Sequence, residues 1–131
     1  MFNINNTIKQ FLLSDTTITG LVGDNIYNLV VFTSDVTPVR PPYLIIEINS
    51  LEPYKTKDYF IYYNLQFSVI AISSKYNEMV TLSEAVKTSL DLKDIDDDIQ
   101  SVTFDSYSES FDSENEVYYS RLSFNSIVYN K

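Results

Sequence analysis

One stretch of the chain, from Tyr59 to Leu90, carries a strand pattern followed at once by a helix pattern. From Asn64 to Ala71 the side chains alternate with a period close to two, which predicts a half-buried strand. The apolar positions of its buried face are Leu65, Phe67, Val69 and Ala71. Spacings of three and four then predict an amphipathic helix, with the stripe Met79, Leu82, Val86 and Leu90. Because such a stripe must be buried against another element, the strand and the helix together predict the core of an α+β domain.

The length and composition exclude several classes of protein. A chain of 131 residues is expected to form a single domain over residues 1–131. It contains no Cys and no His, which excludes cysteine nucleophiles, Ser-His-Asp triads and zinc fingers. The first residues lack the pattern of a signal peptide, and no apolar run approaches the length of a membrane span. We therefore expect a protein made in the cytoplasm, with no catalytic residues, cofactor or membrane partner.

The net charge of −9 comes from one segment of the chain. Between Asp91 and Glu116 there are ten acids and one base, whereas acids and bases are equal in number elsewhere. Binding to DNA or RNA requires the opposite charge, so we expect no sequence-specific nucleic-acid binding. The acids after the predicted helix do not form a calcium loop, because Ile99 and Asp105 stand where Gly and Glu are required.

The remaining signals place the other elements along the chain. Toward the N-terminus they predict a helix over 5–13 capped by Asn5 or Asn6, a helical turn capped by Asp15 or Thr16, a turn at Gly23-Asp24, a strand Ile26–Phe32, a proline-rich loop Thr33–Pro42 and a strand Tyr43–Leu51. Toward the C-terminus they predict a polar connection Glu52–Asp58, a turn Asp91–Asp98, a strand Ile99–Tyr107, an acidic loop Ser108–Asn115 and a strand Val117–Tyr129. The fold class expected is α+β, a mostly antiparallel (mixed) sheet of about five strands with an N-terminal helix and one long helix packed on one face.

The eleven tyrosines are the unusual feature of the composition. A tyrosine offers apolar area and a hydroxyl that tolerates water, which suits a sheet face covered by another subunit. Ordinary β propensity explains the same distribution, so both interpretations stay open. The residues expected at a subunit interface are Tyr54, Tyr59, Tyr62, Tyr119 and Arg121.

Several motifs carry a resemblance to a known family. The segment TITGLVGDNIY is similar to a turn written LvGdrIy, with Asn25 where Arg is usual, and PPYLIIEI is similar to a strand written PyvvyE, with Glu47 in place. The long segment YNLQFSVIAISSKYNEMVTLSEAVKTSL is similar to that family's strand, turn and helix, and an acidic turn and two strands follow. The order of these motifs along the chain resembles that in the small tail terminator and tail-completion proteins of tailed bacteriophages.

The resemblance implies a non-enzymatic structural protein of the virion. It implies a ring, commonly of six copies, that ends tail-tube growth and joins the tail to the head connector. The implied partners are copies of the chain itself, the tail tube protein and connector or portal-side proteins. The implied location is the tail or neck of a particle assembled in the cytoplasm of the bacterial host. In such a ring, Asp96, Asp97 and Asp98 are candidates for an acidic wall facing the DNA channel, although solubility alone would also explain their charge.

Two other classes remain compatible with the sequence. One is a different head–tail connector, such as a head-closure or portal-adjacent ring, for which twelve copies would be expected. The other is a monomeric ligand-binding or enzymatic α+β domain, for which a deep apolar pocket would be expected.

Overall fold

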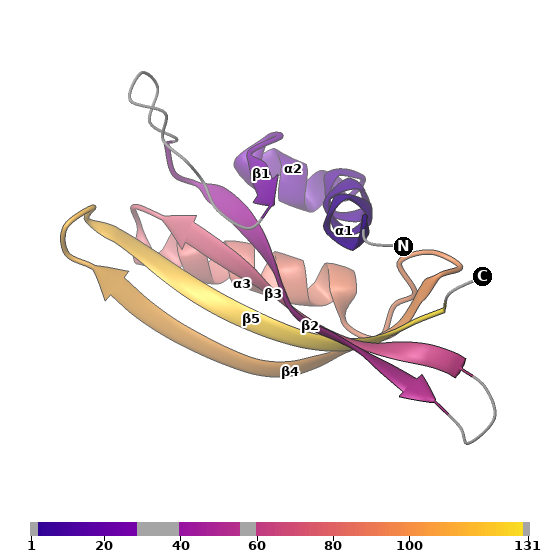
Figure 1. The fold of residues 1–131 in the computed structure, drawn as a ribbon. Coiled ribbons are helices and arrows are strands. Elements are labelled where there is room, and N and C mark those ends of the chain that lie inside the picture. Colours follow the sequence, from indigo (N-terminus) through magenta and orange to yellow (C-terminus); the bar gives the residue numbers. More distant parts are fainter. Residues whose placement is uncertain (1–2, 29–39, 56–59, 130–131) are drawn as a thin grey trace.

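The computed structural model describes residues 3–28, 40–55 and 60–129 (Figure 1). Within these residues the chain forms three helices and one five-stranded mixed sheet, with strand order β1-β2-β3-β5-β4. The elements are α1 (Ile4–Leu13), α2 (Thr16–Val22), β1 (Ile26–Asn28), β2 (Tyr43–Lys55), β3 (Phe60–Ser73), α3 (Tyr76–Leu90), β4 (Ile99–Asp112) and β5 (Val117–Val128). The predicted α+β fold class is confirmed.

The contact between β3 and α3 forms the centre of the core, as the sequence predicted. The four alternating apolar residues of β3 and the four stripe residues of α3 are all fully buried. Phe67 of β3 stacks on Phe124 of β5, with ring centroids 5.3 Å apart. The helix therefore packs across the neighbouring strands β3 and β5.

All buried sheet residues of the main core cluster lie on one face of the sheet. They are Ile26, Leu44, Ile46, Leu65, Phe67, Val69, Ala71, Ile99, Val102, Leu122, Phe124 and Val128. The strand register pairs Leu44 with Ala71 and Val69 with Leu122, so this face is continuous across three strands. Helices α1 and α3 contribute Ile8, Leu12, Leu82 and Val86 to the same cluster. The fold is therefore a two-layer structure, and we call the sheet surface that points away from these helices the open face (Figure 1).

The N-terminal part confirms some predictions and corrects others. Helix α1 begins after Asn3, and the predicted caps Asn5 and Asn6 are wrong because both residues lie inside the helix. No side chain caps α1, since the Asn3 side-chain oxygen instead accepts a hydrogen bond from the Asn6 amide at 2.8 Å. Of the two predicted caps of the next helix, Asp15 is confirmed: it accepts from the Thr17 backbone N–H at 2.9 Å, while Thr16 is the first residue of α2.

The predicted turn after α2 is also confirmed. Gly23 has φ of 64°, a conformation that glycine adopts without steric cost. Strand β1 then pairs in parallel with the start of β2. The rest of the strand predicted to reach Phe32 lies outside the described residues, as does most of the loop predicted over Thr33–Pro42.

Two predicted loops are wrong because strands run through them. Strand β2 continues from Leu51 to Lys55, where Glu52 pairs with Asn64 and Tyr54 with Tyr62. Strand β4 continues to Asp112, and its polar residues pair with β5. In both cases the partner strand supplies the backbone hydrogen bonds that hold the polar segment extended. Only residues 113–116 form the second turn, where the Asp112 carboxylate accepts from the Glu114 N–H at 3.0 Å.

Truncating the α3–β3 contact should destabilise the fold. We expect Leu82→Ala and Phe67→Ala each to lower the free energy of unfolding by about 2–5 kcal/mol, because each leaves a cavity in a closed core. Leu92→Ala is the matched control, since Leu92 is 80% exposed and its truncation leaves no cavity. Urea denaturation measures all three. Losses at both core sites no larger than the loss at Leu92 would contradict the assignment of the buried faces.

Candidate functional site

The interface residues predicted from the sequence gather on the open face. Tyr54 and Tyr62 are directly opposite each other on β2 and β3, while Tyr119 pairs with Ile72 and Arg121 with Ile70. Because alternate residues of a strand point to opposite faces, these positions all share the face away from the buried β3 residues. Tyr59 lies outside the described residues. The structure thus brings four residues from three strands onto one surface.

Three tyrosines form a cluster at one end of the open face. The rings of Tyr54 and Tyr62 are stacked, with centroids 4.9 Å apart, and Tyr129 lies 6.3 Å from Tyr62. Tyr54 remains 48% exposed and Tyr129 36% exposed. Tyr129 was not among the predicted interface residues, although its place in the predicted strand Val117–Tyr129, in the same alternation as Tyr119 and Arg121, was a usable signal. A stacked, solvent-facing aromatic cluster is typical of surfaces that another protein covers.

A second group of tyrosines lies toward the other end of the same face. Tyr27 and Tyr43 meet edge to face at 6.0 Å, and Ile72 lies between Tyr43 and Tyr119 in the strand register. Burial, and secondarily the charge of Asp112, raise the pKa of Tyr43 above its ordinary value. Tyr43 therefore keeps its proton at neutral pH and contributes to this face as an apolar, uncharged group.

The middle of the open face is polar, and its side chains form hydrogen bonds and an ion pair with one another. Arg121 donates to the Glu47 carboxylate at 2.8 Å, and this ion pair spans from β5 across β3 to β2. The Asn49 amide donates to the Ser68 hydroxyl at 2.8 Å, and that hydroxyl lies 3.2 Å from the hydroxyl of Ser123. Exposed ion pairs contribute only about 0.2–1 kcal/mol to stability. Arg121 therefore orders this face more than it stabilises the fold.

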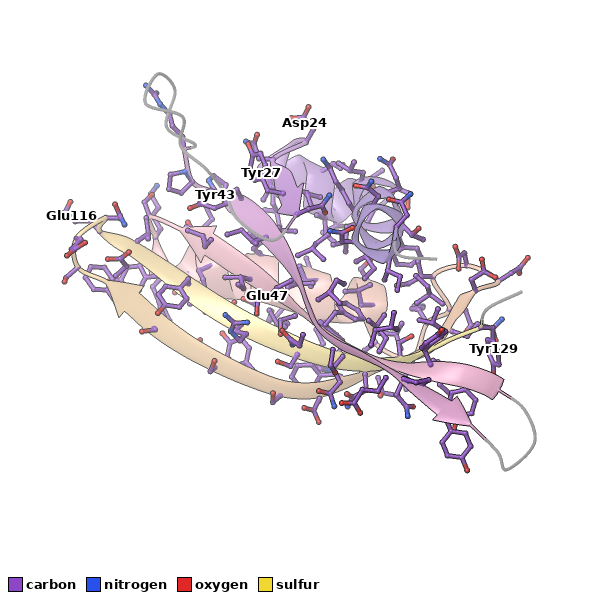
Figure 2. The ribbon with its side chains drawn as sticks, viewed as in Figure 1. Asp24, Tyr27, Tyr43, Glu47, Glu116 and Tyr129 are labelled. Carbon is purple, nitrogen blue, oxygen red and sulfur yellow. The ribbon has the colours of Figure 1, made fainter. Side chains whose placement is uncertain are left out.

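Figure 2 shows how the open face is laid out along the sheet. Glu116 in the β4–β5 turn and Tyr129 lie at opposite ends, and Glu47 lies between them. The acidic loop after α3 lies at the Tyr129 end, because the Tyr129 backbone N–H donates to the Asp98 carbonyl at 2.8 Å. The predicted aromatic interface and the predicted acidic segment are therefore neighbours, which their separation in sequence did not indicate.

The three acids proposed to face a channel have different local roles. The Asp96 carboxylate accepts from the backbone N–H groups of Asp98 and Ile99, both at 2.8 Å, and so closes the loop. Asp97 and Asp98 are exposed, and their carboxylates have no hydrogen-bond partner among the residues that the structure describes. Asp96 is exposed as well, but its carboxylate holds the loop, so Asp97 and Asp98 are the acids whose carboxylates form no hydrogen bond within the described residues.

A further cluster, missed from the sequence, lies on the helix side of β4. The hydroxyls of Tyr76 and Tyr107 both donate to the Glu109 carboxylate, the Tyr76 bond being 2.9 Å long. Burial, with the hydrogen bond to Glu109 second, raises the pKa of Tyr107 to about 12. The cluster was missed because Glu109 was placed in a loop, whereas strand β4 holds it beside Tyr107 and within reach of α3.

Neither a metal centre nor a membrane helix is found in the described ranges. No group of three or more Asp or Glu side chains there could hold a metal ion. None of the helices described is long and apolar enough to cross a membrane.

The fold, but not the sequence, is similar to known proteins. A scan against protein-family models finds no match, and a search of curated proteins finds no similar sequence. Among solved structures, a chain from the virion of a native gene transfer agent (GTA) particle matches with a TM-score of 0.78 and 15% sequence identity. The match covers 97% of this chain and 95% of that chain. At this identity the similarity shows a shared fold over nearly the whole length of both chains.

The tyrosine–glutamate cluster makes a testable prediction about alkaline titration. The Glu109 carboxylate stabilises the protonated phenols, so Glu109→Gln should lower the pKa values of Tyr76 and Tyr107. Because the folded state holds the Tyr107 proton more tightly than the unfolded state, the associated stability is present below pH 10 and is lost as the pH rises toward 12. Tyrosinate absorbance, measured against pH, should therefore rise earlier in the variant.

Two variants control this titration. Asp105→Asn removes a charge from the same strand without removing an acceptor from either phenol, and should leave the absorbance curve unchanged. Tyr107→Phe should remove the most alkaline part of the curve. Superimposable curves for Glu109→Gln and the parent protein would show that this carboxylate does not hold the two hydroxyls in solution.

Proposed function

We propose that the chain is a structural protein of a phage-like virion, acting as a tail terminator or tail-completion ring. The observation that carries the proposal is the shared fold with a chain of a GTA virion, which spans nearly all of both chains. The motifs around Gly23-Asp24 and Glu47, and the order of strand, turn and helix, support the same role by their resemblance to tail terminator proteins. In this role the protein is non-enzymatic and is located in the tail or neck of the particle.

The open face is the proposed contact surface between neighbouring copies in the ring. It carries two groups of tyrosines separated by a polar middle, and no helix from the described residues covers it. Apolar area at both ends can be buried by a neighbour, while the paired Arg121 and Glu47 keep the centre soluble before assembly. We propose six copies, with the tail tube protein below the ring and connector proteins above it.

The main alternative is a different ring of the same neck, such as a head-closure protein. It shares the expectation of a tyrosine-rich subunit contact and differs in position and copy number. A monomeric ligand-binding domain has less support, because the groove found beside α3 is open to solvent rather than deep.

Deleting the gene from the phage separates these roles. A terminator stops polymerisation of the tail tube, so its loss should give tails of uncontrolled length that do not join the filled heads. A head-closure protein acts on the head, so its loss should give tails of normal length and heads that leak DNA. Electron microscopy of lysates distinguishes the two results. Cryo-microscopy of the intact particle should show six copies at the end of the tube, and twelve copies or none would overturn the proposed role.

The acidic loop makes a second prediction within this proposal. If Asp97 and Asp98 face the channel, their charge keeps DNA phosphates from binding the wall, and Asp97→Asn with Asp98→Asn should slow genome ejection at low salt. The defect should shrink as added salt screens the charges. Asp96 is left intact because its carboxylate closes the loop. The measurement is the rate of DNA release from purified particles at several ionic strengths.

The matched control for this experiment removes equal charge from the other end of the sheet. Glu114→Gln with Glu116→Gln alters two exposed acids of the β4–β5 turn and should leave ejection unchanged. Equal ejection rates for both double variants and the parent phage would leave solubility as the role of the acidic loop.

A further inference from the structure

Strand β4 is an edge of the sheet, and its two halves differ in how the outer side is covered. In the first half, Val102 forms a bridge with Lys93, and the Phe104 backbone N–H donates to the Asp91 carboxylate at 2.9 Å. The Ser101 N–H likewise donates to the Asp94 carboxylate at 2.9 Å. The segment after α3 therefore satisfies the outer edge of β4 as far as Phe104.

The second half of β4, Ser106 to Asp112, has a regular outer edge that no strand of the described ranges covers. Its seven residues pair with β5 without a bulge. They include no proline and no lysine, which are common devices for blocking an edge. Tyr107 and Phe111 on this segment are 43% and 49% exposed. This segment, called here the free edge, presents backbone groups in the arrangement to which an additional strand can pair.

The charge of the free edge restricts what can pair with it. Glu109 and Asp112 lie on it, Asp105 precedes it, and Glu114 and Glu116 follow in the turn, with no base among residues 105–116. A second copy offers no suitable strand at the opposite edge, because β1 is only three residues long and the part of β2 beyond it carries Glu47, Glu52 and Pro53. Like charges placed directly opposite each other are destabilising, and proline cannot donate to a ladder. The occupant that fits is therefore a basic strand of a different protein.

A groove beside the free edge adds an apolar subsite. It lies between α3 and β4, has a volume of about 340 Å³, and is lined in its apolar part by Val80, Phe104, Tyr107 and Leu122. A cavity of about 150 Å³ holds a benzene ring, so the groove has room for a large side chain. Glu84 and Glu109 lie at the groove together with Lys87, whose ammonium is 5.2 Å from the centre of the Phe104 ring.

We propose that the free edge binds an extended segment of a partner protein, which adds to the sheet as a sixth strand next to β4. The segment carries Lys or Arg, which face the acids of β4 and of the following turn, and one bulky apolar side chain, which enters the groove. Main-chain hydrogen bonds give this contact its affinity, and the charges and the groove give its specificity. The site is distinct from the open face, so it would remain available in a ring whose subunits meet through that face.

A synthetic peptide tests the proposal with the full-length protein. The probe is acetyl-Lys-Lys-Thr-Phe-Thr-Lys-Lys-amide, which matches the free edge in length and places its one aromatic side chain and two lysines on the same face of the strand. NMR should show shifted and exchange-protected backbone amides from Ser106 to Asp112, with a shift at Val80 in the groove. A peptide of the same sequence with alternate amides N-methylated keeps every charge and loses donors, and should bind much more weakly. A peptide with Glu in place of Lys should not bind.

Matched protein variants distinguish binding at the free edge from nonspecific electrostatic binding of a basic peptide to an acidic protein. Glu109→Gln with Asp112→Asn should weaken binding of the probe by about three- to tenfold, through loss of opposite-charge cross-strand pairs. Asp97→Asn with Asp98→Asn removes equal charge from the other end of the sheet and should leave the affinity unchanged.

Three results would overturn the proposal. They are equal binding of the N-methylated peptide, equal weakening by both double variants, and protection of the free edge that rises with protein concentration without peptide. The last would make a second copy the occupant of this edge. Each of these results would leave the proposed ring function standing, because that role is tested by the tail phenotype and the copy number.

Discussion

Burial of the α3 stripe against β3 and β5 is the interaction on which the rest of the structure depends. Leu82 and Val86 are fully buried together with Phe67 and Phe124, which stack on each other beneath the helix. Each such side chain contributes about 1.5–3 kcal/mol by leaving water. Without this contact the inner face of the sheet would be left in water, so the buried alternation of β3 and β5 fixes which residues of these strands face the helix.

Because the helices pack on one side of the sheet, the other side is free to contact a neighbouring subunit in the proposed ring. The buried cluster takes every second residue of the strands, so the intervening residues must form an exposed surface. Here that surface is neither uniformly polar nor uniformly apolar. Its hydrogen-bonded serines and the Arg121–Glu47 pair lie between two groups of tyrosines. A monomer with this arrangement stays soluble while it retains apolar area that a neighbouring subunit can cover.

The acids between Asp91 and Glu116 lie close together in sequence but have different structural roles. Asp91, Asp94 and Asp96 accept backbone hydrogen bonds and hold the segment after α3 against the first half of β4. The Glu109 carboxylate accepts hydrogen bonds from two tyrosine hydroxyls. The Asp112 carboxylate accepts a backbone hydrogen bond in the β4–β5 turn. Asp97 and Asp98 are left facing solvent. From the net charge alone, all of these acids would be interpreted as one solvated segment.

The sequence by itself determined the elements whose signals are local. Period-two alternation predicted β3, a spacing of three and four predicted α3, Asp15 predicted the start of α2, and Gly23 predicted the turn into β1. Only the tertiary structure decided how far β2 and β4 extend, because their last residues are polar and are held extended by partner strands. It also decided that Arg121 meets Glu47 and that Tyr129 joins Tyr62, since these contacts connect residues that are distant in the chain. The physical reason is that hydrophobic periodicity acts over one element, whereas cross-strand pairing depends on which strands become neighbours.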